Sequence, residues 1–493
     1  MTRDFIRFVR RGRVVELRDF SARTTLLDWL RLDERSTGTK EACAEGDCGA
    51  CTVVLARRRD DTMAYEPVNA CITLLGQIDG AELITVEDLA APDGTLHPVQ
   101  AALVERHGSQ CGFCTPGIVM SLFAHYHRVS APPTRAEIDD VLAGNLCRCT
   151  GYRPIVDAAI AACNDRNDRF TADEPARLAR LEAIADDEDI LVGDDGAFFA
   201  APAREDTLAA LLDAHPDATI VAGATDVGLW ITKKLMPLSK IVHVGRVVGL
   251  DMIEESETTL TFGAAVPLAR AAEDLGALDP DIAEILRRFG SVQVRTAGTV
   301  GGSIANASPI GDLAPILLAL GGTIAMRKGM AVRTLPIEEF FIDYGKQDRA
   351  AGEYVRHLTI QKPGETTLVR AFKITKRMDE DISTVMMAMA ITLDGDVITS
   401  ARIAFGGMAG IPKRATQVEA ALAGARLADP ATWRTAASRL GDDFTPLTDQ
   451  RGSAAYRLTV AGNLIVKGLA EMAGTPTTRT RVKPRAEVFH AAP

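Results

Sequence analysis

The stretch Glu41-Ala42-Cys43-Ala44-Glu45-Gly46-Asp47-Cys48-Gly49-Ala50-Cys51 places three cysteines in one short loop, and Cys71 follows as a fourth thiol. Gly46 and Gly49 carry no Cβ, so the backbone can wrap closely around a bound core and aim its N–H groups at sulfur. We therefore expect Cys43, Cys48, Cys51 and Cys71 to act together as ligands of one metal centre.

The spacing of these cysteines favours one kind of centre. Cys-x4-Cys-x2-Cys with a distant fourth cysteine is the plant-type ferredoxin pattern for a [2Fe–2S] cluster. A structural zinc site also takes four thiolates, but it more often uses paired Cys-x2-Cys turns. Apolar runs at 5–9 and 14–17 predict a hairpin, and 24–32 has helical spacing, so a small mixed sheet that holds one helix is expected. The resemblance of the cysteine loop to plant-type ferredoxins implies that this sheet is a β-grasp.

A second set of thiols lies in a region with a helical period. Helices are expected near 99–103, 116–127 and 154–160, and Thr134 with Glu137 is a capping box for another that ends near 144. The thiols form Cys111-x2-Cys114 and Cys147-x-Cys149, a spacing that alone fits zinc nearly as well as iron–sulfur. Their place after a ferredoxin-type loop favours a second [2Fe–2S] cluster. Cys163 is left over and is expected to be a small buried hydrophobe.

All nine cysteines fall in the first third of the 493 residues. Their odd number, their short separations and the charged start of the chain argue against secretion and a disulfide framework, so a cytoplasmic location is expected. No run approaches 18 apolar residues, so no membrane-spanning helix is expected. A net charge of −11 with 5% aromatic residues gives no basic stripe for nucleic acid.

The length corresponds to about three domains or slightly more. Composition and periodicity suggest a multidomain α+β chain. The expected boundaries are a ferredoxin-like domain at 1–90, a helical domain at 91–163, an acidic linker at 164–189, an α+β domain at 190–370, a smaller α+β domain at 371–475 and a tail at 476–493.

Two glycine-rich loops occur in the cysteine-free part, at 221–228 and 297–312. Their backbones could approach a phosphate group, but ordinary turns explain them about as well. Neither Gly-x-Gly-x-x-Gly nor a P-loop occurs, so a bound dinucleotide would need another fold. The eight histidines are scattered, which predicts no additional metal site, and no nucleophile–base motif indicates a hydrolase.

The stretches Gln110–Gly117 and Gly144–Ile155 make a family resemblance specific. They resemble the helical iron–sulfur domain of the molybdenum hydroxylases, the xanthine dehydrogenase and aldehyde oxidase family, and the resemblance extends from residue 4 to about 470. It implies that Gln110 and Cys149 face the molybdopterin of a partner subunit, because this chain has no room for the large molybdenum-binding part. By family analogy an α2β2 heterotetramer is expected.

The same resemblance covers the glycine-rich loops, which are similar to those of the vanillyl-alcohol-oxidase-like FAD domain. It implies a phosphate-binding loop at 299–303, Phe289 near the isoalloxazine, Asp312 on a polar FAD group, and FAD contacts from Val355 and Lys373. Many relatives carry asparagine where this chain has Ser303. The implied FAD residues of the two loops are Ile220, Val221, Ala222, Gly223, Ala224, Thr225, Asp226 and Val227, then Thr299, Val300, Gly301, Gly302 and Ser303.

A charged stretch around Arg377–Asp381 is either a solvated loop with surface ion pairs or, under the resemblance, the place where NAD+ docks. The resemblance also implies that Tyr344 neighbours the nicotinamide, and it makes Arg377 and Glu380 candidates for the NAD site. The motif that runs from Asp449 to Arg457 is expected to serve structure more than chemistry.

The resemblance implies an electron-transfer subunit of a molybdenum hydroxylase. Electrons would pass from a partner's molybdenum centre, which hydroxylates hypoxanthine or xanthine, through the helical cluster and the ferredoxin-type cluster to FAD and then to NAD+. The alternatives are the corresponding subunit for an aldehyde or another N-heterocycle, and, in a different class, a zinc-binding scaffold.

Overall fold

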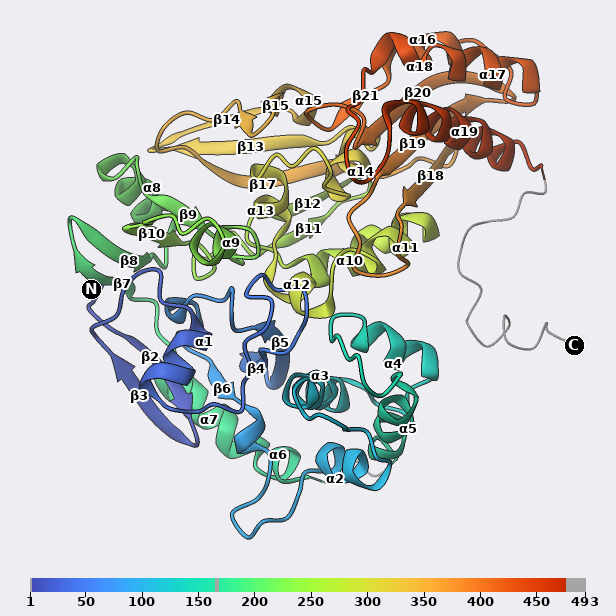
Figure 1. Ribbon diagram of the computed structural model, residues 1–493. Coiled ribbons are helices and arrows are strands. Elements are labelled where there is room, and N and C mark those ends of the chain that lie inside the picture. The colour runs from blue at the N-terminus through green and yellow to red at the C-terminus, as the bar shows by residue number, and fades with distance from the viewer. Residues whose placement is uncertain (1, 165–167, 476–493) are drawn as a thin grey trace, which may run out of the picture. The chain divides into compact units, whose positions relative to one another are not determined.

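A computed structural model describes residues 2–164 and 168–475 of the chain (Figure 1). The chain divides into two compact units. Of the described residues, the first unit contains 2–164, 168–211, 217–248 and 290–298, and the second contains 212–216, 249–289 and 299–475. The segment at 290–298 therefore returns to the first unit after part of the second.

The first sheet of the first unit has the strand order β3-β2-β6-β4-β5. The predicted hairpin is confirmed, since β2 and β3 pair antiparallel, while β2 and β6 run parallel as in a β-grasp. The expected helix is a short α1 followed by a π-helical turn at Trp29–Asp33. The strands are β2 (Ile6–Arg10), β3 (Arg13–Leu17), β4 (Thr52–Arg59), β5 (Thr62–Asn69) and β6 (Glu82–Ile84), and α1 spans Leu26–Asp28; 3-10 turns lie at Leu75–Ile78 and Val86–Asp88.

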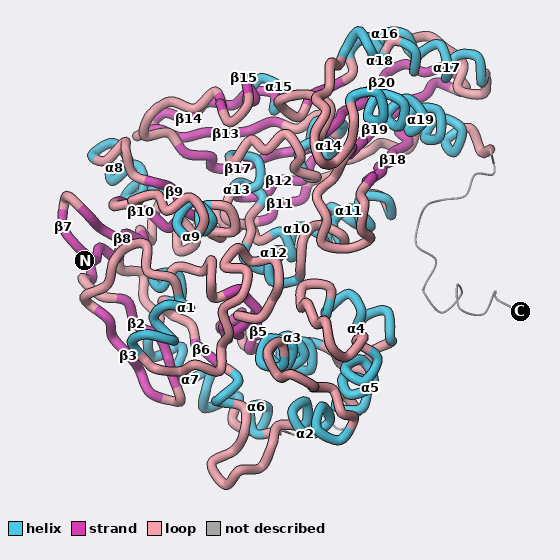
Figure 2. The backbone as a smooth tube through the Cα atoms, viewed as in Figure 1, coloured by secondary structure: helices cyan, strands magenta, loops and turns pink. Residues whose placement is uncertain are grey.

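A group of four helices follows (Figure 2). The capping box is confirmed, because Thr134 Oγ1 accepts from the Glu137 N–H and a Glu137 carboxylate oxygen accepts from the Thr134 N–H. Phe123 and Tyr126 of the second helix lie in the hydrophobic core of this domain, and Cys163 is buried there as expected. The helices are α2 (Pro98–Glu105), α3 (Thr115–Arg128), α4 (Arg135–Leu142) and α5 (Arg153–Ala162).

The segment expected to be a linker contains two helices, α6 (Arg169–Ala172) and α7 (Glu174–Ile184). Phe170, Leu181 and Ile184 are buried in the same core as the four helices, so this acidic segment has an apolar face of its own. After α7, Asp186 forms ion pairs with Arg3 and Arg7.

The second sheet of the first unit has the order β1-β7-β8-β10-β9, and its edge strand is the chain start, which pairs parallel with β7. The elements are β1 (Thr2–Arg3), β7 (Asp189–Asp194), β8 (Ala197–Ala201), β9 (Thr219–Val221) and β10 (Lys240–His243), with α8 (Glu205–Ala214), α9 (Val227–Thr232) and α12 (Val292–Ala297).

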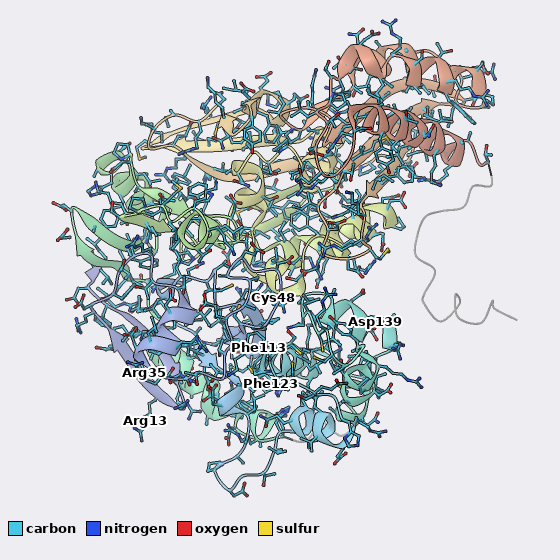
Figure 3. All side chains as sticks on the ribbon, viewed as in Figure 1. Arg13, Arg35, Cys48, Phe113, Phe123 and Asp139 are labelled. Carbon is cyan, nitrogen blue, oxygen red and sulfur yellow. The ribbon has the colours of Figure 1, made fainter. Side chains whose placement is uncertain are left out.

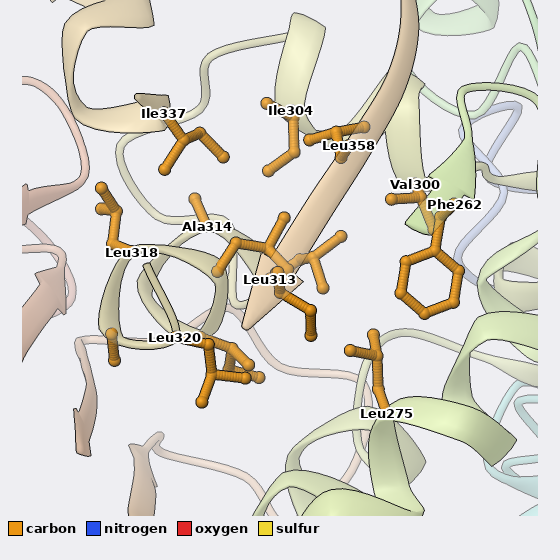
Figure 4. Close-up of a cluster of buried hydrophobic side chains, with 14 of the residues drawn as sticks. Phe262, Leu275, Val300, Ile304, Leu313, Ala314, Leu318, Leu320, Ile337 and Leu358 are labelled. Atoms are coloured by element: carbon orange, nitrogen blue, oxygen red, sulfur yellow. The ribbon is translucent and has the colours of Figure 1, made fainter. Parts of the chain in front are cut away.

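In the second unit, the sheet β11-β12-β17-β13-β14 packs against helices through a large apolar core. Phe262 of β12 lies near Leu275 and Val300, and Leu313 lies among these side chains (Figure 4). The elements are β11 (Ile253–Glu255), β12 (Thr259–Gly263), α10 (Leu268–Leu278), α11 (Pro280–Arg287), α13 (Val300–Ala305), α14 (Leu313–Ala319), β13 (Thr323–Lys328), β14 (Ala331–Pro336), α15 (Ile337–Phe340), β15 (Phe341–Asp343), β16 (Lys346–Gln347) and β17 (Tyr354–Gln361).

The last part of the second unit is an antiparallel sheet, β18-β19-β20-β21, with a long closing helix, which makes it α+β. The elements are β18 (Thr367–Ile374), β19 (Val385–Asp394), β20 (Val397–Gly406), β21 (Lys413–Arg414), α16 (Thr416–Leu422), α17 (Pro430–Ser438), α18 (Leu440–Asp443) and α19 (Ala454–Met472). The tail expected at 476–493 lies outside the described residues. Within the described residues, no helix combines the length and apolarity needed to cross a membrane.

Candidate functional site

The loop between the π-helical turn and β4 gathers the first cysteine set. The Cys48 N–H donates to Cys43 Sγ at 3.4 Å. Gly46 and Gly49 have φ of +78° and +68°, a left-handed conformation that glycine adopts without strain. The loop therefore turns backbone N–H groups toward sulfur, as the sequence suggests.

The thiols of this set are close enough to change one another's acidity. Hydrogen bonds from Cys48 and then Cys71 hold the pKa of Cys43 far below its usual range. The same contacts raise the pKa of Cys48 and of Cys71, the latter also through Cys51. Cys43 therefore contacts Cys48 and Cys71, and Cys71 contacts Cys51, so the four thiols form one cluster.

The second cysteine set joins the start of α3 to the loop before α5. Cys114 is the residue before the first turn of α3, and the Sγ atoms of Cys149 and Cys111 lie 3.5 Å apart. Burial and a hydrogen bond with Cys147 raise the pKa of Cys114 to about 12. Cys111 and Cys149 are exposed, and so is Phe113, which lies between Cys111 and Cys114 and is labelled in Figure 3.

Tyr152 shapes the loop of the second set. Its hydroxyl accepts from the Cys147 N–H at 2.7 Å and donates to the Asn145 carbonyl at 3.0 Å. The residue itself has φ +68°, directly before α5. This tyrosine therefore closes the turn that presents Cys147 and Cys149.

Each cysteine set offers four thiolates, which is the ligand number of a [2Fe–2S] core and also of a structural zinc ion. Outside the cysteine sets, the ligand atoms of His97, His127 and Asp168 all lie within 4.8 Å of one another.

The group of His97, His127 and Asp168 is better explained as structure. His97 Nδ1 accepts from the Val99 N–H at 3.2 Å, so its proton is on Nε2, which donates to Asp168 at 2.7 Å. A protonated Nε2 has no lone pair for a metal. The carboxylate also accepts from the Thr171 N–H and begins α6, which fastens this segment to the helical domain.

The two cysteine loops are in direct contact. The Leu146 N–H, next to Cys147, donates to the Cys48 carbonyl at 2.9 Å. A Cβ on Gly49 would lie 2.1 Å from the Gly144 carbonyl oxygen, so only glycine permits this approach. Asn145 Nδ2 donates to the Gly49 carbonyl at 3.1 Å. The sequence showed Asn145 only inside a longer motif, and its bridging role was missed because its partner lies 96 residues away.

The first predicted FAD loop, 220–227, connects β9 to α9. A Cβ on Gly223 would lie 1.8 Å from the Ala297 carbonyl oxygen, so packing against residues 297–298 already requires glycine there. Ala224 has φ +58°, and burial raises the pKa of Asp226. This packing explains Gly223 without a ligand, so the glycine does not by itself indicate a phosphate contact.

The second predicted loop, 299–303, begins α13, and Thr299 Oγ1 accepts from the Gly302 N–H at 3.0 Å. A Cβ on Gly301 would lie 2.5 Å from Ala264 Cβ, whereas Gly302 is exposed and meets only the Thr299 hydroxyl. The Gly302 N–H is thus already satisfied by the Thr299 hydroxyl, and Ser303 beside it is half-buried. The role of this loop in binding FAD stays a prediction.

The structure brings two of the predicted FAD residues together. Lys373 Nζ donates to Asp312 at 2.6 Å and to the Arg288 carbonyl at 3.2 Å, and both side chains of the pair are buried. Phe289, which follows Arg288, packs on the apolar core of this unit, and Val355 is buried in that core. A buried ion pair beside these residues is a rigid polar group of the kind that could orient a flavin.

The predicted NAD residues lie in exposed segments. Tyr344 follows β15 and is 76% exposed, so its ring is free to stack. Burial acts to raise the pKa of Asp381, but the N–H groups of Arg377 and Lys376 outweigh it and hold that pKa below its usual range. Arg377 also donates to the Glu380 carbonyl at 2.7 Å, so Arg377 and Glu380 belong to one ordered turn.

Four parts of the chain match known family models. Residues 12–76 match a 2Fe-2S iron-sulfur cluster binding domain and 85–160 a [2Fe-2S] binding domain. Residues 196–362 match the FAD binding domain in molybdopterin dehydrogenase, and 370–472 the CO dehydrogenase flavoprotein C-terminal domain. The chain is a molybdenum hydroxylase iron–sulfur and FAD module. It thus has two [2Fe–2S] binding domains and an FAD-binding domain, and the predicted fold class is confirmed.

Curated relatives of this module are larger proteins. Xanthine dehydrogenase 1 of Arabidopsis thaliana is 31% identical over 83% of this chain, and xanthine dehydrogenase of Emericella nidulans is 32% identical over 93%. The chain spans only 35% and 38% of their respective lengths.

Solved structures resemble part of the module. A chain of quinoline 2-oxidoreductase from Pseudomonas putida 86 is 26% identical, with a TM-score of 0.51 over 56% of this chain and 96% of that one. A chain of carbon monoxide dehydrogenase from Hydrogenophaga pseudoflava has a TM-score of 0.53 at 23% identity, which speaks for the fold alone.

Proposed function

We propose that this chain is the electron-transfer subunit of a bacterial xanthine dehydrogenase. It would accept electrons from a molybdenum-binding partner that hydroxylates hypoxanthine or xanthine, and deliver them to NAD+. The observation that carries the proposal is the direct contact of the two cysteine loops, Leu146 N–H to Cys48 C=O at 2.9 Å, in a chain that continues into an FAD-binding domain.

The chain's own residues would hold the cofactors. Cys43, Cys48, Cys51 and Cys71 would bind one [2Fe–2S] cluster, and Cys111, Cys114, Cys147 and Cys149 would bind the other. Bound clusters supply one-electron transfer, and FAD couples it to two-electron hydride chemistry with NAD+. The protein contributes fixed distances and a backbone that aims N–H groups at sulfur.

The proposed partner subunit and the proposed electron acceptor are each argued from a separate feature. Exposed Cys111, Cys149 and Phe113, with Gln110 beside them, would face the partner's pterin, and an α2β2 assembly is proposed from the family. Tyr344, with Arg377 and Glu380, would receive the nicotinamide nucleotide, because Tyr344 offers an exposed ring for stacking and Arg377 offers a cation on an ordered turn.

Reduction by NADH tests the acceptor. Mixing the purified chain with NADH should bleach the flavin, and Tyr344→Leu should slow the bleaching at least tenfold while photochemical reduction of the flavin is unchanged. Flavin that is present but inert toward NADH would contradict the NAD+ proposal.

The substrate is tested in the complex with the co-purifying large chain. Xanthine should reduce NAD+ much faster than an aldehyde or quinoline. A preference for quinoline would instead favour the alternative N-heterocycle enzyme, for which the similarity to quinoline 2-oxidoreductase is the supporting observation.

A further inference from the structure

A buried glutamine lies where the two cysteine loops meet. Gln293, on α12, is 1% exposed. Its Nε2 is 3.1 Å from Thr52 Oγ1, from Ser121 Oγ and from Asn145 Oδ1. Thr52 begins β4 just after Cys51, Ser121 lies on α3, and Asn145 precedes the Cys147 loop, so one amide contacts three elements that carry or adjoin cysteine ligands.

The other hydrogen bonds of this network fix the orientation of the Gln293 side-chain amide. Thr52 Oγ1 donates to the Gly49 carbonyl at 2.7 Å, and Ser121 Oγ donates to Asn145 Oδ1 at 2.7 Å. Each hydroxyl has thereby used its only hydrogen and can only accept from Gln293. The two hydrogens of the Gln293 amide are shared among three acceptors, so its Nε2 must point toward the cysteine loops.

The opposite side of Gln293 is held by close packing. A Cβ on Gly144 would lie 2.5 Å from Gln293 Oε1 and 2.4 Å from Ser291 Cβ. Gln293 Oε1 has no hydrogen-bond partner among the residues that the structure describes, so the side chain is kept in place by its donors and by the Gly144 turn. Figure 1 shows α12 beside β5 and α3, although α12 comes from the sequence matched by the FAD-binding family.

We propose that Gln293 is a positioning residue that fixes the separation and orientation of the two cysteine loops, and with them the coupling between the clusters that the loops would hold. Leu146 N–H to Cys48 C=O is the contact that the network supports, because Asn145 lies directly before Leu146 and Gly49 directly after Cys48. The electronic part of this inference rests on the proposed function, whereas the positioning part concerns the protein alone.

Two variants of Gln293 and a matched control test the proposed positioning role. Gln293→Met keeps the length and removes the donors, and Gln293→Glu keeps the shape but presents an acceptor to Asn145 Oδ1. Trp433→Phe is the control, because it removes one buried hydrogen bond, from Trp433 Nε1 to the Leu427 carbonyl at 2.8 Å, in the C-terminal domain. The readouts are amide hydrogen exchange at Leu146 and the magnetic splitting between the two reduced clusters in electron paramagnetic resonance.

The proposal predicts about five- to tenfold faster exchange of the Leu146 amide in both Gln293 variants, corresponding to a lost hydrogen bond, and a changed magnetic splitting at full iron content. Trp433→Phe should change neither. If Gln293→Met has the same Leu146 amide exchange rate and the same magnetic splitting as the unchanged chain, the proposal is overturned. If Gln293→Met fails to accumulate, Ser121→Ala takes its place, because it removes a donor and an acceptor of the same network. It should likewise speed the exchange of the Leu146 amide and change the magnetic splitting. A chain without iron would contradict the proposed function, and the exchange rate would still decide the positioning.

Discussion

The ammonium of Lys373 donates to the carboxylate of Asp312 at 2.6 Å in the interior of the second unit, and Ser383 Oγ donates to the other carboxylate oxygen at 2.5 Å. Removing the cation leaves a buried charge with one hydroxyl partner. We expect Lys373→Met to lower the free energy of unfolding of the flavin-free chain by about 3–5 kcal/mol, measured by urea denaturation.

An exposed pair provides the control for that substitution. Lys362 donates to Glu255 at 2.7 Å, but the Glu255 side chain is 63% exposed. Lys362→Met should therefore cost no more than about 1 kcal/mol. Equal losses in the two variants would show that the Lys373–Asp312 pair has no special role.

Tyr152→Phe tests the turn that presents the second cysteine set. The variant leaves the Cys147 N–H and the Asn145 carbonyl without their shared hydroxyl, at a cost of about 1–3 kcal/mol. We expect altered resonance of the helical cluster with the ferredoxin-type cluster unchanged. If both cluster signals stay as they were, Tyr152 does not shape the site.

Arg457 explains how the motif that begins at Asp449 stabilises the structure. Its guanidinium, 3% exposed, donates to the Thr384 carbonyl at 2.5 Å, to the Gly407 carbonyl at 2.7 Å and to Asp449 at 2.6 Å. A lysine cannot reproduce this fork, so Arg457→Lys should destabilise the chain by about 2–4 kcal/mol in urea denaturation.

The control for Arg457 is Arg426→Lys, because Arg426 pairs with Asp396 and is 73% exposed. It should change the stability by less than about 1 kcal/mol. A loss in Arg457→Lys no larger than in Arg426→Lys would contradict the structural reading of the motif.

His125 predicts a pH dependence of stability. It is 5% exposed, its ring nitrogens have no hydrogen-bond partner in the described part of the chain, and burial followed by Arg128 lowers its pKa to about 4, while Glu137 acts in the opposite direction. Above pH 6.5 neither the folded nor the unfolded chain is protonated at this residue. Between pH 6.5 and 4 only the unfolded chain takes the proton, so stability should fall by up to about 3 kcal/mol.

The measurement compares the free energy of unfolding near pH 7 and near pH 5. His125→Leu should flatten the decline, whereas His107→Asn, at an exposed position with φ +56°, should not. An unchanged decline in His125→Leu would assign the pH dependence to other groups.

Local patterns predicted much of this molecule. The β2–β3 hairpin and the Thr134–Glu137 capping box depend on residues close together in the chain, and the structure has both of them. The segment at 164–189 was misjudged as a plain linker because its charges hide the apolar positions Phe170, Leu181 and Ile184.

Contacts between distant segments could not be predicted in this way. Gln293 lies 241 residues from Thr52, and its only local sign is a polar residue between Val292 and Val294, just before the glycine cluster. The pairing of Lys373 with Asp312 likewise depends on how β18 packs, although each residue was singled out on its own.

Metal analysis with electron paramagnetic resonance of the reduced chain tests the central claim, that two [2Fe–2S] clusters sit in contacting loops of one chain. The account predicts about four irons per chain and two distinct signals of equal intensity. A colourless chain loaded with zinc and silent in this measurement would contradict it.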